Sequence, residues 1–122
     1  MFNFEKLEVW NKGIEIAGLI YEVTWRFRDS ERFGLVNQMQ RAAVSIASNI
    51  AEGASRSSRC DNARYVEIAV GSLFELVTQA VFAKRQGFLT EDEFDRIYAL
   101  ASEESRMLTG LRIFLLSDRS AP

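Results

Sequence analysis

The sequence predicts an all-α protein, an antiparallel four-helix bundle in up-down-up-down order, and three observations lead to this prediction. The only proline is Pro122, so no internal position forbids a long helix. Apolar residues recur every three or four positions in four segments, without the alternation and turn signals typical of strands. The connections are short, which makes consecutive helices antiparallel. Residues 1–122 are expected to form a single domain.

The first helix is expected to span residues 4–27, capped by Asn3, and it carries two apolar stripes. One stripe consists of Leu7, Trp10, Ile14, Ala17 and Tyr21. The other consists of Val9, Gly13, Ile16, Ile20, Val23 and Phe27. A monomeric four-helix bundle requires only one apolar face from each helix. We therefore expect the second stripe to contact another subunit, with a broad internal face as the alternative.

The second helix is expected over residues 30–53, with Asp29 or Ser30 as its N-cap and Gly53 as a left-handed C-cap. Only Arg41 and Glu52 are charged between residues 34 and 53, which is typical of a helix covered on most sides. Its main stripe consists of Leu35, Met39, Ala42, Ile46 and Ile50.

Capping patterns delimit the third and fourth helices, expected over residues 58–86 and 90–116. Ser58 with Asp61 and Thr90 with Glu93 match the capping box, and Gly87 matches a C-cap. Gly71 is expected to admit a neighbouring helix closely, and residues 117–122 to form a frayed tail. The core rows are Val66, Val70, Leu73, Val77 and Ala80, then Tyr65, Ala69, Leu76 and Ala83, and finally Phe94, Ile97, Ala101, Leu108, Leu111 and Leu115.

Composition excludes several function classes. The chain has no histidine, which removes the commonest general base and metal ligand, and its single Cys60 forms no intrachain disulfide. The net charge of −2 indicates no strong field toward nucleic acid or membrane. The first ten residues have neither the basic nor the apolar region of a signal peptide, so none is expected, and no apolar run approaches the length of about 20 residues that spans a bilayer. We expect a cytoplasmic protein that is not an enzyme, binds no metal or cofactor, and does not enter membranes.

Arg56, Arg59 and Arg64 gather around the second turn and are the candidate nucleic-acid-binding residues. Copies of this cluster at one end of a ring could bind phosphates. The alternative is a solvated loop that places cations near a helix C-terminus. At the other end of the bundle, acidic residues lie close to the basic ones in the sequence, so that end is expected to be nearly neutral.

A second set of polar residues lies beside the apolar rows: Arg41, Asn49, Glu52, Glu75, Gln79 and Glu104. An enzyme would pair Glu52 with Glu75 as acid and base. A network of hydrogen bonds between helices or subunits is the preferred interpretation, because charges beside a core need partners. Trp10 and most of the nine phenylalanines are expected in the core, and Trp25 is the aromatic residue most available for stacking on bases.

Four segments in order resemble the four-helix-bundle proteins named after 23S rRNA intervening sequences. They are FEKLEVW (Phe4–Trp10), GLVNQMQRAAVSIASNIAEG (Gly34–Gly53), IAVGSLFELVTQ (Ile68–Gln79) and AKRQGFLTEDEF (Ala83–Phe94). The resemblance implies a homopentameric ring and carries no catalytic residue. A relative in that family, the accessory variability determinant of diversity-generating retroelements, binds a reverse transcriptase and nucleic acid. This chain has Ala47 where that family usually has proline, which implies an absent or a milder kink in the second helix, and Gln40-Arg41 where the family often has a basic pair.

Two functions follow as hypotheses for the expected homo-oligomer. The first is an accessory factor that associates with RNA or DNA, or with a nucleic-acid-processing protein, through Arg56, Arg59 and Arg64. The second is a ring-shaped scaffold that binds a protein partner and no nucleic acid. The acidic balance of charge favours the second, and the family relative favours the first.

Overall fold

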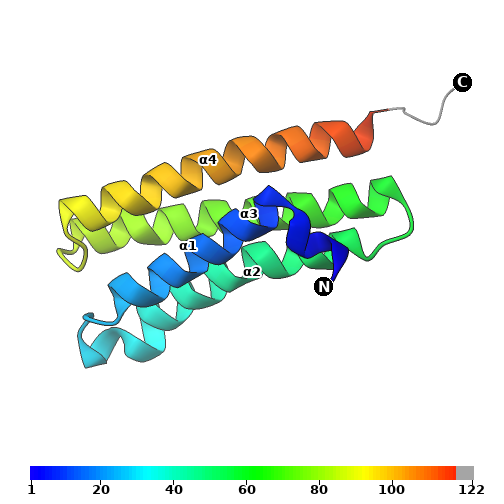
Figure 1. The fold of residues 1–122 in the computed structure, drawn as a ribbon. Helices are drawn as coiled ribbons and strands as arrows, with labels where there is room; N and C mark the ends of the chain where they lie inside the picture. Colours follow the sequence, from blue (N-terminus) through cyan, green and yellow to red (C-terminus); the bar gives the residue numbers. More distant parts are fainter. Residues whose placement is uncertain (118–122) are drawn as a thin grey trace, which may run out of the picture.

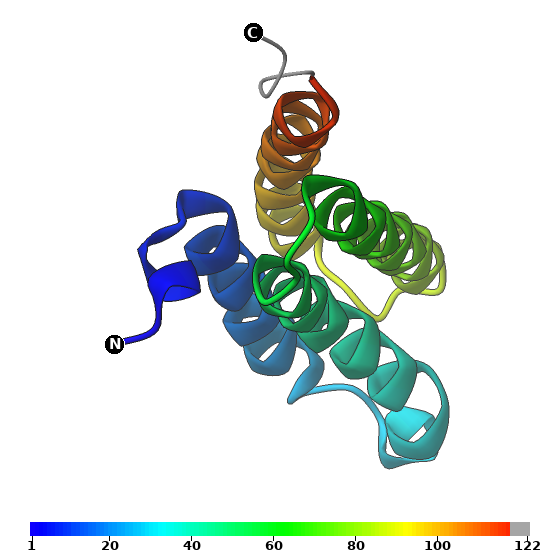
Figure 2. The same cartoon turned by 90° about the vertical axis from the view of Figure 1, so that its right-hand side faces the viewer.

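A computed structural model describes residues 1–117 and confirms the all-α four-helix bundle. The helices are α1 (Glu8–Thr24), α2 (Asn37–Ala54), α3 (Arg59–Arg85) and α4 (Glu91–Leu116). They run antiparallel in sequence order (Figure 1). Seen along its axis, the bundle has α2 beside α1 and α3, and α4 beside α3 and α1 (Figure 2). The expected tail lies outside the described residues from position 118 onward.

The predicted N-caps of α3 and α4 are confirmed, and of the two only α4 has the complete, reciprocal capping box. The Ser58 hydroxyl accepts a hydrogen bond from the Asp61 amide at 3.0 Å. The Thr90 hydroxyl accepts one from the Glu93 amide at 3.1 Å, and the Glu93 carboxylate accepts one from the Thr90 amide at 2.9 Å. Gly87, at φ +80°, ends the α3 segment in the left-handed conformation.

The predicted start of the first helix is wrong. A separate 3-10 turn, η1 (Asn3–Lys6), precedes α1, and Leu7 between them has an extended backbone. The Asn11 side-chain amide donates to the carbonyl oxygens of Glu5 and Leu7 at 2.9 Å each. These carbonyl groups therefore have a hydrogen-bond donor although the helix is interrupted at Leu7. The Phe4 ring packs edge-on against Trp10, with 5.2 Å between centroids, and folds the turn back over α1.

The start of the second helix also differs from the prediction. Neither Asp29 nor Ser30 caps it, because a 3-10 turn, η2 (Asp29–Glu31), and a π-helical turn, η3 (Arg32–Val36), lead directly into α2. Gly53 is no left-handed C-cap, since it lies buried inside α2. A Cβ atom there would be 2.6 Å from Asn62 Oδ1. The glycine therefore permits close packing of α2 on α3. Helix α2 continues through Ala47.

The core fills the space between all four helices and contains most of the predicted rows, but Tyr65, expected in a row of α3, is only half-buried and lies outside it. Its fully buried large side chains include Ile16, Ile20, Met39, Ile46, Ile50, Leu73, Leu76, Ile97 and Leu108. Gly71, by contrast, is exposed and has no neighbouring atom within 4 Å of its Cβ position, so it does not admit a helix of the same chain. Helix α3 is long and apolar enough to cross a membrane by length and composition, a test that the core helix of a soluble bundle also passes.

Candidate functional site

The three candidate arginines all lie at the end of the bundle where α2 connects to α3, but the structure brings only two of them together. Arg56 donates a hydrogen bond to the Tyr65 hydroxyl at 2.8 Å, and its guanidinium carbon is 4.6 Å from the centre of the Tyr65 ring. The Arg64 guanidinium carbon is 5.0 Å from the same ring centre. Arg59 instead donates to the carbonyl oxygen of Phe114 in the last turn of α4 and packs over its ring.

Two of these arginines are partly neutralised by nearby carboxylates. Arg56 lies 3.4 Å from Glu52, and Arg64 lies 3.8 Å from Asp61. Both ion pairs are exposed, so each is worth no more than about 1 kcal/mol and can open to admit a ligand. The cluster can therefore contact phosphates only in competition with Glu52 and Asp61.

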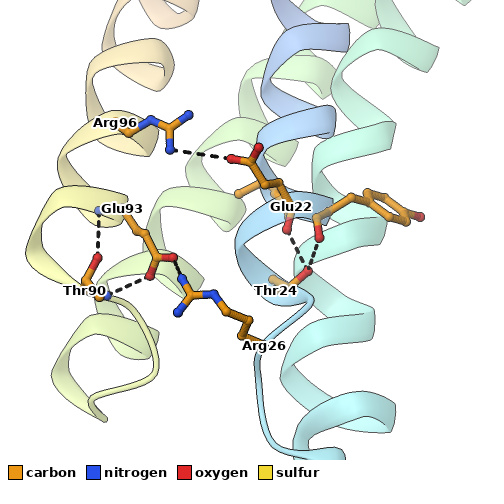
Figure 3. A network of polar contacts seen from close by, with 8 residues as sticks. Glu22, Thr24, Arg26, Thr90, Glu93 and Arg96 are labelled. Atoms are coloured by element: carbon orange, nitrogen blue, oxygen red, sulfur yellow. Dashed lines mark hydrogen bonds and ion pairs between the residues drawn. The ribbon is translucent and has the colours of Figure 1, made fainter.

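The opposite end of the bundle pairs most of its charges, in agreement with the prediction of a nearly neutral surface. Figure 3 shows Arg26 of the α1–α2 connection bound to Glu93, the residue that also caps α4, and Arg96 of α4 at 3.5 Å from Glu22 of α1. Lys84 lies 3.2 Å from Glu91. These contacts join α1 to α4 and α3 to α4 and leave little free positive charge.

The assignment of the second α1 stripe to a subunit contact is wrong. All six residues, Val9, Gly13, Ile16, Ile20, Val23 and Phe27, are buried within the single chain. The other stripe faces outward, with Ile14 at 47% and Tyr21 at 50% exposure. The sequence shows two stripes on one helix, but only the position of α1 against α2 and α4 decides which one the same chain covers.

An apolar groove of about 260 Å³ lies along α1 and α2 on this outward side. Phe4, Trp10 and Ile14 line one wall, and Val44 lines the other. Val44 is 44% exposed. These residues form the α1/α2 face, which Ala47, Ser48 and Ala51 complete.

A second apolar groove, of about 480 Å³, lies between α3 and α4 on the opposite side of the bundle. Phe74, Val77 and Tyr98 are among its lining residues and define the α3/α4 face. Phe74 is 60% exposed and Tyr98 is 51% exposed. Sequence reasoning missed this face because it expected most phenylalanines in the core. That expectation is wrong: of the nine, only Phe27 is buried, since Phe74 and others lie off the core rows.

The polar residues beside the apolar rows form only a small part of the expected network between helices. Asn49 donates to Ser45 of its own helix, whose hydroxyl oxygen lies 2.9 Å from that of Ser72 in α3, and Glu52 pairs with Arg56. Both carboxylate oxygens of Glu104 are buried without a hydrogen-bond partner within residues 1–117, as is Gln79 Oε1. Burial raises the pKa of Glu104 to about 8, against an opposing effect of Lys12, so the carboxyl is mostly protonated at neutral pH.

In the part of the chain that the structure describes, the carboxylates considered as metal ligands or as an acid–base pair do not gather at one place. Within residues 1–117, no three His, Cys, Asp or Glu side chains lie close enough to hold a metal ion. Glu75 belongs to a polar groove between α2 and α3, apart from Glu52, which binds Arg56. Cys60 is exposed.

Comparison with known proteins matches this chain to one family over most of its length. The family model described as 23S rRNA-intervening sequence protein matches residues 5–110. A similar crystal structure is that of a protein of unknown function from the S23 ribosomal protein family of Bacteroides thetaiotaomicron VPI-5482. It has a TM-score of 0.77 and 23% identity over 85% of this chain and 97% of the other, which shows a shared fold. No curated protein matches significantly. The chain belongs to the 23S rRNA-intervening sequence protein family.

Proposed function

We propose that this protein is a non-enzymatic scaffold that assembles into a homo-oligomeric ring through its two apolar faces. The single observation that carries the proposal is their placement: the α1/α2 face and the α3/α4 face lie on opposite sides of the bundle. A symmetric dimer requires one self-complementary patch, whereas a ring requires two different patches on each subunit. The α1/α2 face of one subunit would pack on the α3/α4 face of the next.

The two remaining sides of the bundle are polar, which supports the assignment of subunit packing to the two apolar faces. The α1/α4 side carries ion pairs, including Lys12 with Glu103 at 3.3 Å and Glu22 with Arg96 at 3.5 Å. The α2/α3 side has a groove lined mostly by polar groups. In a ring built from the apolar faces, one polar side would line the lumen and the other would form the outer wall. The resemblance to pentameric proteins supplies the number of five subunits.

Light scattering at two protein concentrations tests the assembly. The scaffold predicts a mass near five times 13.9 kDa that changes little with concentration. Phe74→Asp places a charge on the α3/α4 face and is expected to reduce the mass to that of one chain. The control Glu8→Gln, an exposed residue at the start of α1, is expected to leave it unchanged. A wild-type mass of 13.9 kDa would rule out the ring.

Nucleic-acid association is the second candidate, and the placement of Tyr65 between Arg56 and Arg64 favours it. An aromatic ring beside two cations can stack on a base while the guanidinium groups contact phosphates. Binding of a mixed RNA and DNA sample should then fall steeply as salt is raised. Arg64→Gln should weaken it more than the control Arg85→Gln at the other end of the bundle. Equal effects of both variants, or no binding at low salt, would reject this candidate and leave the scaffold intact.

A further inference from the structure

A polar groove of about 510 Å³ runs between α2 and α3, on a side of the bundle that neither apolar face uses. Its α2 wall presents Asn37, Gln38 and Arg41, and its α3 wall presents Glu75. Ser45, at the lining of the groove, lies 2.9 Å from Ser72 through their hydroxyl oxygens, which fixes the two walls to each other. The volume lies within the range of small-ligand sites, about 300–1,000 Å³.

Arg41 and Glu75 place opposite charges on opposite walls of this groove, and neither charged group has a polar partner within residues 1–117. Both side chains are exposed, and neither forms a hydrogen bond or ion pair with any described residue. They are also not within ion-pair distance of each other. Two unused charges of opposite sign across one groove suit a neutral ligand that carries donors on one edge and acceptors on another.

Phe33 lines the same groove and is 92% exposed. It lies in η3, the π-helical turn at the start of α2, and π-helical turns occur often at functional sites. An aromatic ring with this exposure contributes little to the core. It offers a flat surface on which a planar ligand can stack beside the two charged groups.

We propose that the α2/α3 groove binds a guanine base stacked on Phe33, between Glu75 and Arg41. Guanine presents two adjacent donors, N1–H and the N2 amino group, to a carboxylate, and two adjacent acceptors, O6 and N7, to a guanidinium. Adenine and uracil lack both of these pairs, and cytosine lacks the pair of donors. The groove has no excess positive charge for a phosphate, so the base itself is the recognised group. A free guanine nucleotide and an unpaired guanine in an RNA strand share this chemistry.

Calorimetric titration with GMP and AMP, and with a short oligouridine RNA containing one central guanosine or adenosine, tests the proposal. We expect guanine to bind at least about tenfold more tightly than adenine, the value of one good bidentate pair. IMP, which lacks the N2 amino group, should bind more weakly than GMP to the wild type but as tightly as GMP to Glu75→Ala, whose side chain has no hydrogen-bond acceptor. The 7-deazaguanine analogue of GMP, which lacks the N7 acceptor, should bind more weakly than GMP to the wild type. It should bind as tightly as GMP to Arg41→Met.

Variants of the groove complete the test. Glu75→Gln, Arg41→Met and Phe33→Ala should each weaken guanine binding about tenfold or more, and Glu8→Gln should not. Unchanged circular dichroism would show that each variant is folded, and these exposed positions make that the expected result.

The two kinds of ligand distinguish the source of the base. A preference for GMP over AMP would identify a free nucleotide as the ligand, and a preference seen only with the RNA would identify an unpaired guanine in a strand. Absence of any guanine preference, or a preference that survives all three groove variants, would overturn the proposal. Binding that ignores the base and weakens with salt belongs to Arg56 and Arg64, and would also overturn it.

Discussion

One carboxylate oxygen of Glu104 in α4 lies 3.2 Å from the position that a Cβ atom would occupy at Gly13 in α1. The same Cβ position is 3.3 Å from the Cβ atom of Ala47 in α2. Three helices therefore meet around a buried carboxyl, and they meet there because residue 13 has no side chain.

We predict that Gly13→Ala destabilises the protein although alanine is the better helix former. The added methyl group crowds Glu104 and Ala47, and overpacking typically costs about 1–3 kcal/mol, against a gain of about 1 kcal/mol in helix propensity. Gly18→Ala on the same helix is the matched control, because no atom lies within 4 Å of its Cβ position. Urea denaturation should show lower stability for Gly13→Ala and higher stability for Gly18→Ala. Stabilisation by both would contradict the close contact.

Glu104 should make the free energy of unfolding fall as pH rises. Burial raises the pKa of Glu104 to about 8 in the folded protein, above its ordinary value of 4.5. Between these two values the folded chain holds a proton that the unfolded chain has released, so rising pH favours unfolding by up to about 1.4 kcal/mol per pH unit. Lys12 stays charged throughout this range, because Glu103 raises its pKa above 10.5.

Glu104→Gln isolates this effect from the other titrating groups. The amide has nearly the shape of the protonated carboxyl, so at pH 5, close to the ordinary pKa of 4.5, the variant should be more stable by no more than about 1 kcal/mol. At pH 8.5 the variant should be more stable by about 2 kcal/mol or more. Urea denaturation across pH 5–9 measures the difference. Parallel curves for the two proteins would show that Glu104 is not the buried titrating group.

Gly53→Ala should be among the most destabilising small substitutions in the chain. Its Cβ atom would lie 2.6 Å from Asn62 Oδ1 and 2.9 Å from Tyr65 Cβ, so α2 and α3 would have to separate. We expect a loss of about 2–3 kcal/mol, whereas Gly71→Ala, at an open position of α3, should gain about 1 kcal/mol. Thermal denaturation followed by circular dichroism measures both, and similar effects of the two substitutions would count against tight packing at Gly53.

Thr90→Ala removes the cap of α4 and should cost about 1 kcal/mol. The loss comes from the uncapped Glu93 amide and from a freer Glu93 side chain, which also binds Arg26 (Figure 3). Thr78→Ala is the control, since its hydroxyl bonds only to the Phe74 carbonyl on the exposed side of α3. Chemical denaturation should separate the two variants, and equal stabilities would contradict a structural role for the capping box.

Features encoded by neighbouring residues could be predicted from the sequence. The caps at Ser58 and Thr90 and the left-handed Gly87 depend on side chains within a few residues, and the core rows depend on spacing along one helix. The break at Leu7 could not be predicted, because it depends on the Asn11 side chain bonding back to Glu5 and on Phe4 packing against Trp10.

The candidate surfaces could be predicted only in part, because they depend on how helices sit against each other. Periodicity identifies both α1 stripes, but the positions of α2 and α4 decide that the stripe containing Ile16 is buried and the one containing Ile14 is exposed. Glu104 lies in register with Ala101 and Leu108, so its burial could be predicted from the sequence. The lack of a hydrogen-bond partner for its carboxyl group could not. The three arginines lie at the same end of the bundle as expected, but only Arg56 and Arg64 share the Tyr65 ring, whereas Arg59 packs over Phe114.

Mixing two variants, each with one apolar face disrupted, tests the proposed ring most directly. Ile14→Asp should abolish packing through the α1/α2 face, and Phe74→Asp should abolish it through the α3/α4 face, so each variant alone should be a 13.9 kDa monomer. In an equal mixture, the intact face of one variant meets the intact face of the other, and light scattering should show a dimer of twice that mass. A mixture that stays monomeric, or a single variant that keeps the wild-type mass, would contradict a head-to-tail contact between these faces.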